Sequence, residues 1–234
     1  MTTPNPVDAM QPNLDLALLL SRRQLTELVY DAVNLEGINF TLPEVQTLLD
    51  GVTIGGHKLS DQTIALNQAE AWDYLFKAIE NSSFTVDKTF ACNLHAIASK
   101  EETLESGKFR SGNVTIAGTD YMPPKAETLD DEWLQMINHI SNINNIFERA
   151  FAVFLQMARN QFFYDVNKRM GRFMMNGILL QAGYPVINVP VKRKLEFNEN
   201  MLTFYESNDM QPMMTFLFSC IDPRIVEIMS QQND

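Results

Sequence analysis

The stretch Gln161-Phe-Phe-Tyr-Asp-Val-Asn-Lys-Arg-Met-Gly-Arg172 decides how the chain is interpreted. It places one acid, one asparagine, one lysine and two arginines within the eight positions from Asp165 to Arg172. Apolar sequence precedes and follows it, over residues 147–163 and 173–180. Charged residues between two apolar helical segments usually mark a turn whose polar groups have a function. The run itself contains no His, Cys or Ser that could act as a base or nucleophile.

Composition narrows the class of protein. Hydrophobic residues make up 45% of the 234 residues, and 10 Gly with 10 Pro are too few for a fibrous or low-complexity chain. The 18 basic and 29 acidic residues give a net charge of −11, which argues against a nucleic-acid or anionic-membrane surface. Because neither a signal peptide nor a membrane span is apparent, we expect a soluble, cytoplasmic protein.

Helical periodicity extends over most of the chain. The pair Thr41 and Glu44 has the spacing of a capping box, so a helix is expected to begin there and to end near Gly51. Further helices are expected at about 14–35, 61–80, 85–99, 129–159, 169–182, 197–206 and 211–219. The predicted organisation is a flexible lead at 1–13, N-terminal helices within 14–60, a core domain at 61–225 and a C-terminal tail at 226–234.

Residues 107–124 differ from the rest of the chain. Val114 and Ile116 alternate there with small polar residues, and Pro123-Pro124 closes the segment. Alternation of this kind predicts short extended strands. The sequence therefore predicts an all-α domain with one short β-hairpin.

The central run resembles the signature of the Fic (Fic/Doc) family, His-Pro-Phe-x-Asp/Glu-Gly/Ala-Asn-Gly/Lys-Arg followed by x-x-Arg. Residues 107–124 resemble the flap hairpin of that family, and the region around Glu36-Gly37 resembles its N-terminal inhibitory helix. The resemblance covers most of residues 30–220 and implies a Fic-type helical domain. The matching signature residues are Phe163, Asp165, Asn167, Lys168, Arg169 and Arg172, and Gly171 fits the usual continuation.

Family members mostly transfer AMP from ATP to a protein hydroxyl, so the resemblance implies ATP and Mg²⁺ as cofactors of an active protein. Asp165 would hold Mg²⁺, which takes one or two carboxylates together with phosphate oxygens. Backbone N–H groups at the helix N-terminus would form an anion nest. The implied nucleotide-binding residues are Asn167, Lys168, Arg169, Gly171 and Arg172.

Two further segments receive roles from the same resemblance. Glu36, followed by Gly37, would regulate the site by pairing with Arg172, which would otherwise reach the terminal phosphate. In related sequences a Ser or Thr precedes this Glu by four residues, whereas Ala32 stands there in this chain. The flap residues Val114, Thr115 and Ile116 would hold a segment of the target protein by strand addition.

Two departures from the signature fall on the chemistry. Gln161 replaces the His that serves the family as general base, and an amide cannot accept a proton near pH 7. Losing a positioned base typically lowers the rate about 10²–10⁴-fold. Val166 replaces a small residue, and Phe162 replaces a proline. Because the signature admits Ala at the position of Val166, we attribute its preference to close packing against phosphate and not to a positive φ.

The three histidines lie outside the run and do not supply the missing base. His95 and His139 have apolar neighbours on predicted helices, so we expect both to be structural. His57 follows Gly55-Gly56 in a predicted loop, and we expect it to be exposed to solvent.

The leading hypothesis is a Fic-type protein with a nucleotide pocket and impaired or absent AMP transfer. One alternative is a non-catalytic interaction module on the same scaffold. Others are the removal of AMP from a modified protein, with Glu36 orienting water, and phosphoryl transfer, and both meet the objection of the missing base. The expected partners are a nucleotide and a target protein, without nucleic acid or membrane. Whether the chain forms a homo-oligomer stays open.

Overall fold

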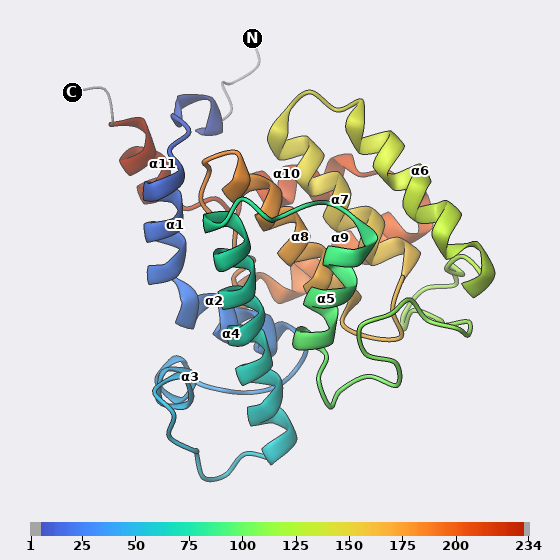
Figure 1. Ribbon diagram of the computed structural model, residues 1–234, viewed down its shortest axis with the longest axis horizontal. Helices are drawn as coiled ribbons and strands as arrows, with labels where there is room; N and C mark the ends of the chain where they lie inside the picture. The colour runs from blue at the N-terminus through green and yellow to red at the C-terminus, as the bar shows by residue number, and fades with distance from the viewer. Residues whose placement is uncertain (1–5, 232–234) are drawn as a thin grey trace.

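The computed structural model describes residues 6–231 of the chain, and within them it is built of helices and loops (Figure 1). Three short 3₁₀ helices accompany the α-helices: η1 (Pro6–Ala9), η2 (Ala126–Thr128) and η3 (Val191–Arg193). The α-helices are α1 (Leu14–Arg23), α2 (Leu25–Leu35), α3 (Leu42–Leu49), α4 (Leu59–Glu80), α5 (Lys88–Ala98), α6 (Leu129–Ser141), α7 (Ile146–Asn160), α8 (Asn167–Gln181), α9 (Lys194–Ser207), α10 (Gln211–Phe218) and α11 (Pro223–Ser230). The all-α prediction is confirmed.

Helices α7 and α8 form the centre of the fold, and α8 is buried on nearly all sides (Figure 1). Helices α1, α4 and α5 pack against α8, while α6 and α10 pack against α7. The two central helices approach closely at Gly171, where an added Cβ would lie 2.8 Å from the carbonyl oxygen of Phe154. Gly171, expected among the nucleotide-binding residues, is therefore a helix-packing residue, because its Cα faces α7.

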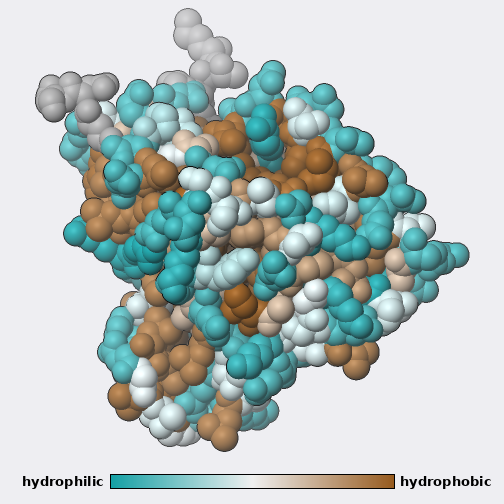
Figure 2. All heavy atoms as spheres, viewed as in Figure 1, coloured by the Kyte–Doolittle hydropathy of each residue, from teal (hydrophilic) through white to brown (hydrophobic). Residues whose placement is uncertain are grey.

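The N-terminal helices confirm the predicted local signals. The side chain of Thr41 accepts from the backbone N–H of Glu44, and Glu44 accepts in return from the backbone of Thr41, so the capping box is formed. Helix α2 packs on α3 and α4 and ends at Glu36, followed by Gly37 with φ of +92°. Apolar side chains are exposed around α3 and α4 (Figure 2), and they include Leu42 of α3, Val52 in the loop that follows and Leu59 at the start of α4.

The structure differs from the predicted flexible lead at 1–13 and from the predicted C-terminal tail at 226–234 where it describes them. Val7 and Met10 are buried, and η1 packs against α11. Helix α11 in turn occupies much of the expected C-terminal tail and buries Ile225 and Met229. Helices η1 and α11, from the first and last described parts of the chain, are thus packed against each other. The remainder of each prediction, residues 1–5 and 232–234, lies outside the described residues.

The predicted β-hairpin at 107–124 is not seen, since no strand occurs within residues 6–231. The segment is an extended loop whose base is held by the buried side chain of Arg110. Its guanidinium donates to the carbonyl oxygens of Gly112 (2.8 Å) and Pro124 (2.5 Å), at the two ends of the loop. Hydrogen bonds from the Arg110 side chain therefore close this loop, in place of the backbone hydrogen bonds that would join two strands. Among the described helices, none is long and apolar enough to cross a membrane.

Candidate functional site

The loop between α7 and α8 is shaped by two non-glycine residues in the left-handed region. Gln161 ends α7 with φ of +50°, and Val166 precedes α8 with φ of +66°. A left-handed residue other than glycine costs about 1–2 kcal/mol, and a β-branched one is unusual there. The interpretation that position 166 needs only a small side chain was wrong: it needs a positive φ. Val166 is tolerated because its side chain is buried.

Asn167, the first residue of α8, holds this loop in shape. Its Oδ1 accepts from the backbone N–H of Phe163 (2.9 Å), and its Nδ2 donates to the carbonyl oxygen of Phe163 (2.8 Å). Nδ2 also donates to Oε1 of Gln161 (3.0 Å), while Nε2 of Gln161 donates to the carbonyl oxygen of Ala158 (2.5 Å). The amide of Gln161 therefore joins the end of α7 to the start of α8, and Asn167 acts here through its side chain on the loop.

A small cavity of about 60 Å³ lies at the N-terminus of α8. The first N–H groups of a helix have no partner within it, and Val166 supplies no side-chain acceptor for them. The helix dipole adds partial positive charge at the same place. This arrangement suits an anion, and we call the cavity the nest. Its lining consists of Glu36, Gln161, Asp165, Val166, Asn167, Lys168 and Arg169.

A larger pocket of about 450 Å³ shares several residues with the nest. It runs between the 107–124 loop, the α7–α8 loop and α9. Of the predicted flap residues, Thr115 and Ile116 line this pocket, whereas Val114 does not line it. Its lining residues are Glu36, Thr115, Ile116, Ala117, Gln161, Tyr164, Asp165, Lys168, Asn198, Met201, Leu202 and Tyr205. The four residues from α9 were not predicted, because their helical spacing looks like that of core residues.

Glu36 reaches the nest from the end of α2. Its Oε2 lies 3.3 Å from Nζ of Lys168, and the two side chains are 25% and 32% exposed. Burial raises the pKa of Glu36, but the charges of Lys168, Arg169 and Arg172 outweigh burial, so that the pKa is lowered. The expected ion pair between Glu36 and Arg172 was wrong in its partner. Glu36 pairs with Lys168, while Arg172, one turn further along α8, is buried beside a separate cavity.

Arg169 is held by an acid that sequence reasoning missed. Both of its Nη atoms bond to the carboxylate of Glu102, and the Arg169 side chain is 4% exposed. Glu102 lies in the loop after α5, 67 positions earlier, and nothing in its local sequence separates it from a solvated acid. Arg169 also lines the nest, so its charge is close to the nest but already paired.

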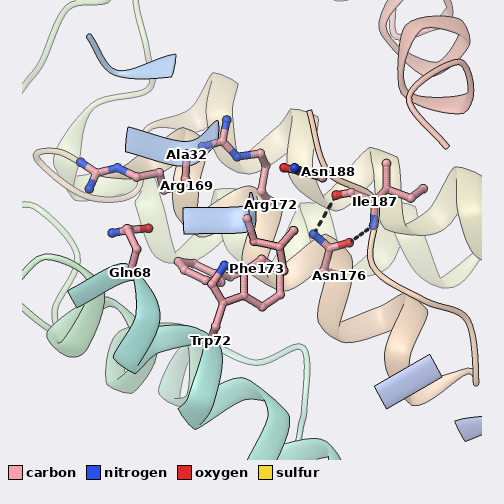
Figure 3. Close-up of a pocket in the computed structure, with 10 residues that line it drawn as sticks. Ala32, Gln68, Trp72, Arg169, Arg172, Phe173, Asn176, Ile187 and Asn188 are labelled. Atoms are coloured by element: carbon pink, nitrogen blue, oxygen red, sulfur yellow. Dashed lines mark hydrogen bonds between the residues drawn. The ribbon is translucent and has the colours of Figure 1, made fainter. Parts of the chain in front are cut away.

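Arg172 lies in neither the nest nor the larger pocket. Its guanidinium is buried beside a separate, smaller cavity between α2, α4 and α8 (Figure 3). Burial lowers the pKa of Arg172 to about 10, against the opposing effect of Glu36 and Asp31. Arg172 is thus still cationic at neutral pH. The expectation that it reaches a phosphate in the nest does not fit this arrangement.

Asp165 is the expected metal ligand and is exposed at the rim of both the nest and the larger pocket. Its Oδ1 accepts from the backbone N–H of Val166 (2.7 Å). In the part of the chain that the structure describes, no group of three or more His, Cys, Asp or Glu could hold a metal. One carboxylate fits Mg²⁺ only when phosphate oxygens and water complete the shell.

Of the three histidines, His95 has the structural role predicted for it, whereas His139 and His57 differ from their predictions. His95 is buried, stacks on Phe163 at 3.8 Å between ring centroids, and accepts at Nδ1 from the N–H of Gly107 (3.0 Å), so it is structural. His139 is exposed instead, on the outer face of α6. His57 is not freely exposed, because its Nε2 lies 3.1 Å from Oε1 of Glu44.

Comparison with known proteins gives consistent matches. Residues 85–179 match the family described as Fic/DOC. The chain is 23% identical over 201 residues to "Protein adenylyltransferase Fic" of Drosophila erecta, covering 83% of this chain and 40% of that protein. The Drosophila melanogaster protein of the same name is 22% identical with the same coverage. The chain therefore spans about two fifths of the length of these curated relatives.

Two solved structures resemble the fold closely. Fic-1 from C. elegans superposes with a TM-score of 0.77 at 16% identity, over 98% of this chain and 66% of that chain. A Fic domain containing signaling protein from Bacteroides thetaiotaomicron has a TM-score of 0.77 at 20% identity, over 97% and 93%. At such identities the likeness is one of fold.

Proposed function

We propose that the chain, whose residues 85–179 match the Fic/DOC family, binds ATP with Mg²⁺ while transferring AMP to protein hydroxyls weakly or not at all. The observation that carries this proposal is the position of Gln161, which lines both the nest and the larger pocket. At the position of the family's general base the two cavities thus meet an amide, which cannot take a proton.

The shape and charge of the two cavities support nucleotide binding. The nest offers helix N-terminal N–H groups for phosphate, with Lys168 at its edge. The larger pocket, at about 450 Å³, falls in the range of small-molecule sites and has room for a nucleoside. Asp165 at the shared rim would hold Mg²⁺, which neutralises phosphate charge when bound. Curated relatives named as protein adenylyltransferases agree with this choice of ligand.

The hydrogen bonds of Gln161 support the loss of transfer. Its Oε1 is engaged by Asn167 and its Nε2 by Ala158, so both ends of the amide serve the loop. A target hydroxyl brought along Thr115 and Ile116 would meet no base at this position. The expected deficit is the factor of about 10²–10⁴ that a positioned base supplies. A target or partner protein remains part of the proposal, since the 107–124 loop borders the pocket.

A second candidate, an interaction module without nucleotide, is favoured by the pairing of the nest's cations. Glu36 pairs with Lys168, and Glu102 pairs with Arg169. An anion entering the nest would therefore have to compete with Glu36 for Lys168. Under this candidate, ATP would change neither thermal stability nor partner binding.

Calorimetric titration with ATP and Mg²⁺ separates the two candidates. We expect saturable binding to the full chain, weakened at least about tenfold by Lys168→Met, which removes the charge at the nest. Lys192→Met, an exposed lysine on η3, is the matched control and should leave the affinity unchanged. Absence of both heat and a thermal shift with ATP would rule out the nucleotide proposal and favour the interaction module.

A further inference from the structure

The guanidinium of Arg172 is buried without a hydrogen-bond partner for either Nη atom among the described residues. Arg172 is 8% exposed and lines a cavity of about 20 Å³ (Figure 3). Leaving charged donors unsatisfied in the interior costs more than leaving neutral ones. The cavity is therefore a place where a partner for Arg172 is missing from the protein itself.

Two more unpaired polar atoms belong to residues of the same lining. Arg169 uses both Nη atoms on Glu102, which leaves its buried Nε without a partner. Gln68 of α4 donates through Nε2 to the carbonyl oxygen of Ala98 (3.2 Å), which leaves its Oε1 unpaired. The unpaired atoms of this lining are therefore three donors, both Nη atoms of Arg172 and Nε of Arg169, and one acceptor, Oε1 of Gln68. The cavity is donor-rich and carries positive charge.

The other polar lining residues are already satisfied. Asn176 exchanges two hydrogen bonds with the backbone of Ile187, drawn as dashed lines in Figure 3. Asn188 donates through Nδ2 to Oδ2 of Asp31. The rest of the wall is largely apolar, with Leu28, Ala32, Trp72 and Phe173. Among these side chains only Gln68 keeps an unpaired acceptor, and it forms no hydrogen bond with Arg172.

The acidic side chains near Arg172 already form hydrogen bonds or ion pairs with other residues. Asp31 accepts from Asn188 and from the backbone N–H of Val191 (2.7 Å). Glu36 pairs with Lys168, and Glu102 pairs with Arg169. Within residues 6–231, Arg172 forms no ion pair closer than 4.0 Å, although its Cζ lies 6.0 Å from the ring centroid of Phe197. A cation in this setting favours an anion over a neutral ligand, since water offers no charge to offset it.

We propose that this cavity binds one small monovalent inorganic anion, of which chloride is the probe, held by the Nη atoms of Arg172. A volume of about 20 Å³ suits a single small ion better than a phosphate or a carboxylate ligand. The site is separate from the nest, because Arg169 is the one residue that lines both. The proposal does not depend on nucleotide binding. The bound anion would link α2 and α4 to the buried face of α8.

Thermal unfolding of the full chain tests the proposal. Chloride is titrated against gluconate, which is too large for the cavity, at constant ionic strength. A ligand that binds only the folded state stabilises it in proportion to the logarithm of its concentration, so Tm should rise by about 3–6 °C per tenfold increase in chloride above its Kd. The same Tm in both salts would overturn the proposal.

Two variants separate specific binding from general salt effects. Arg172→Met keeps the length of the side chain without its charge, so its Tm should not differ between chloride and gluconate. If that variant does not fold, Ala32→Ser decides, because its hydroxyl would occupy part of the cavity and accept from Arg172. A chloride shift that persists unchanged in the folded variant overturns the proposal.

Crystals of the full chain soaked in bromide give a direct view. We expect one anomalous peak within hydrogen-bonding distance of Nη of Arg172, and no peak there in Arg172→Met. If Arg172→Met does not fold, a weaker peak is expected in Ala32→Ser. A water molecule at this position without anomalous signal would show that the cavity is hydrated only, and the proposal would be wrong.

Discussion

Oε1 of Gln161 accepts a hydrogen bond from Nδ2 of Asn167 over 3.0 Å, which links the residue that ends α7 to the residue that begins α8. The same amide donates to the carbonyl oxygen of Ala158. Gln161 is therefore more than a lost base, because it takes part in holding the loop around the nest. A substitution at this position changes the chemistry and the loop together.

Restoring the base should restore transfer only when the nest is also opened. Gln161→His alone should leave AMP transfer low, because Glu36 still pairs with Lys168 at the nest. Gln161→His combined with Glu36→Gly should raise transfer of labelled AMP by about 10²–10⁴-fold, the range of a positioned base.

Gln161→Asn in the Glu36→Gly background is the matched control for this restoration. It retains an amide without a basic nitrogen and should show no gain. If the His variant binds ATP and still transfers no more AMP than the Asn control, position 161 is not what limits the reaction.

The two ion pairs around the nest should differ sharply in how much each contributes to the free energy of unfolding. The pair of Glu102 with Arg169 is nearly buried, so Glu102→Gln leaves a buried guanidinium short of its counter-charge and should cost roughly 3–5 kcal/mol. Glu36→Gln breaks a pair that is a quarter to a third exposed and should cost about 1 kcal/mol or less. Urea unfolding measures both variants. Equal losses would contradict the assignment of Glu102 as the structural partner.

Because the backbone at Val166 is strained, replacing this residue with glycine should lower the free energy of unfolding less than at other buried positions. Val166→Gly gives up about 1.5–3 kcal/mol of apolar burial but relieves about 1–2 kcal/mol of left-handed strain. Val153→Gly, at a buried position inside α7, loses similar burial and a further ~0.5 kcal/mol of helix propensity. The free energy of unfolding should therefore fall by about 1.5–2.5 kcal/mol less in Val166→Gly. Equal losses would show that the φ of +66° is not strained.

Local signals explain what could be predicted from the sequence. The capping box of Thr41 and Glu44 depends on two residues three positions apart, so it could be read directly. The placement of Asp165, Asn167 and Lys168 around the start of α8 followed from the signature run, and the structure brings them to one cavity. Contacts within a few positions of the chain need no tertiary information.

What could not be predicted depends on distant contacts. Glu102 meets Arg169 across 67 positions, and Glu36 meets Lys168 in place of Arg172 because one turn of α8 faces the nest and the next faces α2. The alternation of Val114 and Ile116 suggested strands, but Arg110 closes the loop with side-chain bonds. Such outcomes are set by packing, which periodicity does not report.

His95 should make stability depend on pH below neutrality. Burial lowers the pKa of His95 from 6.5 to about 4, opposed by the backbone of Asp165. Because the folded-state pKa lies below the unfolded value, the unfolded chain binds more protons in this window. Stability is therefore intact above pH 6.5 and falls by roughly 3 kcal/mol as pH drops toward 4. Urea unfolding across this range should show the loss in wild type and in His139→Gln, the exposed control. His95→Gln should flatten it, and an unchanged slope in that variant would assign the pH dependence to other groups.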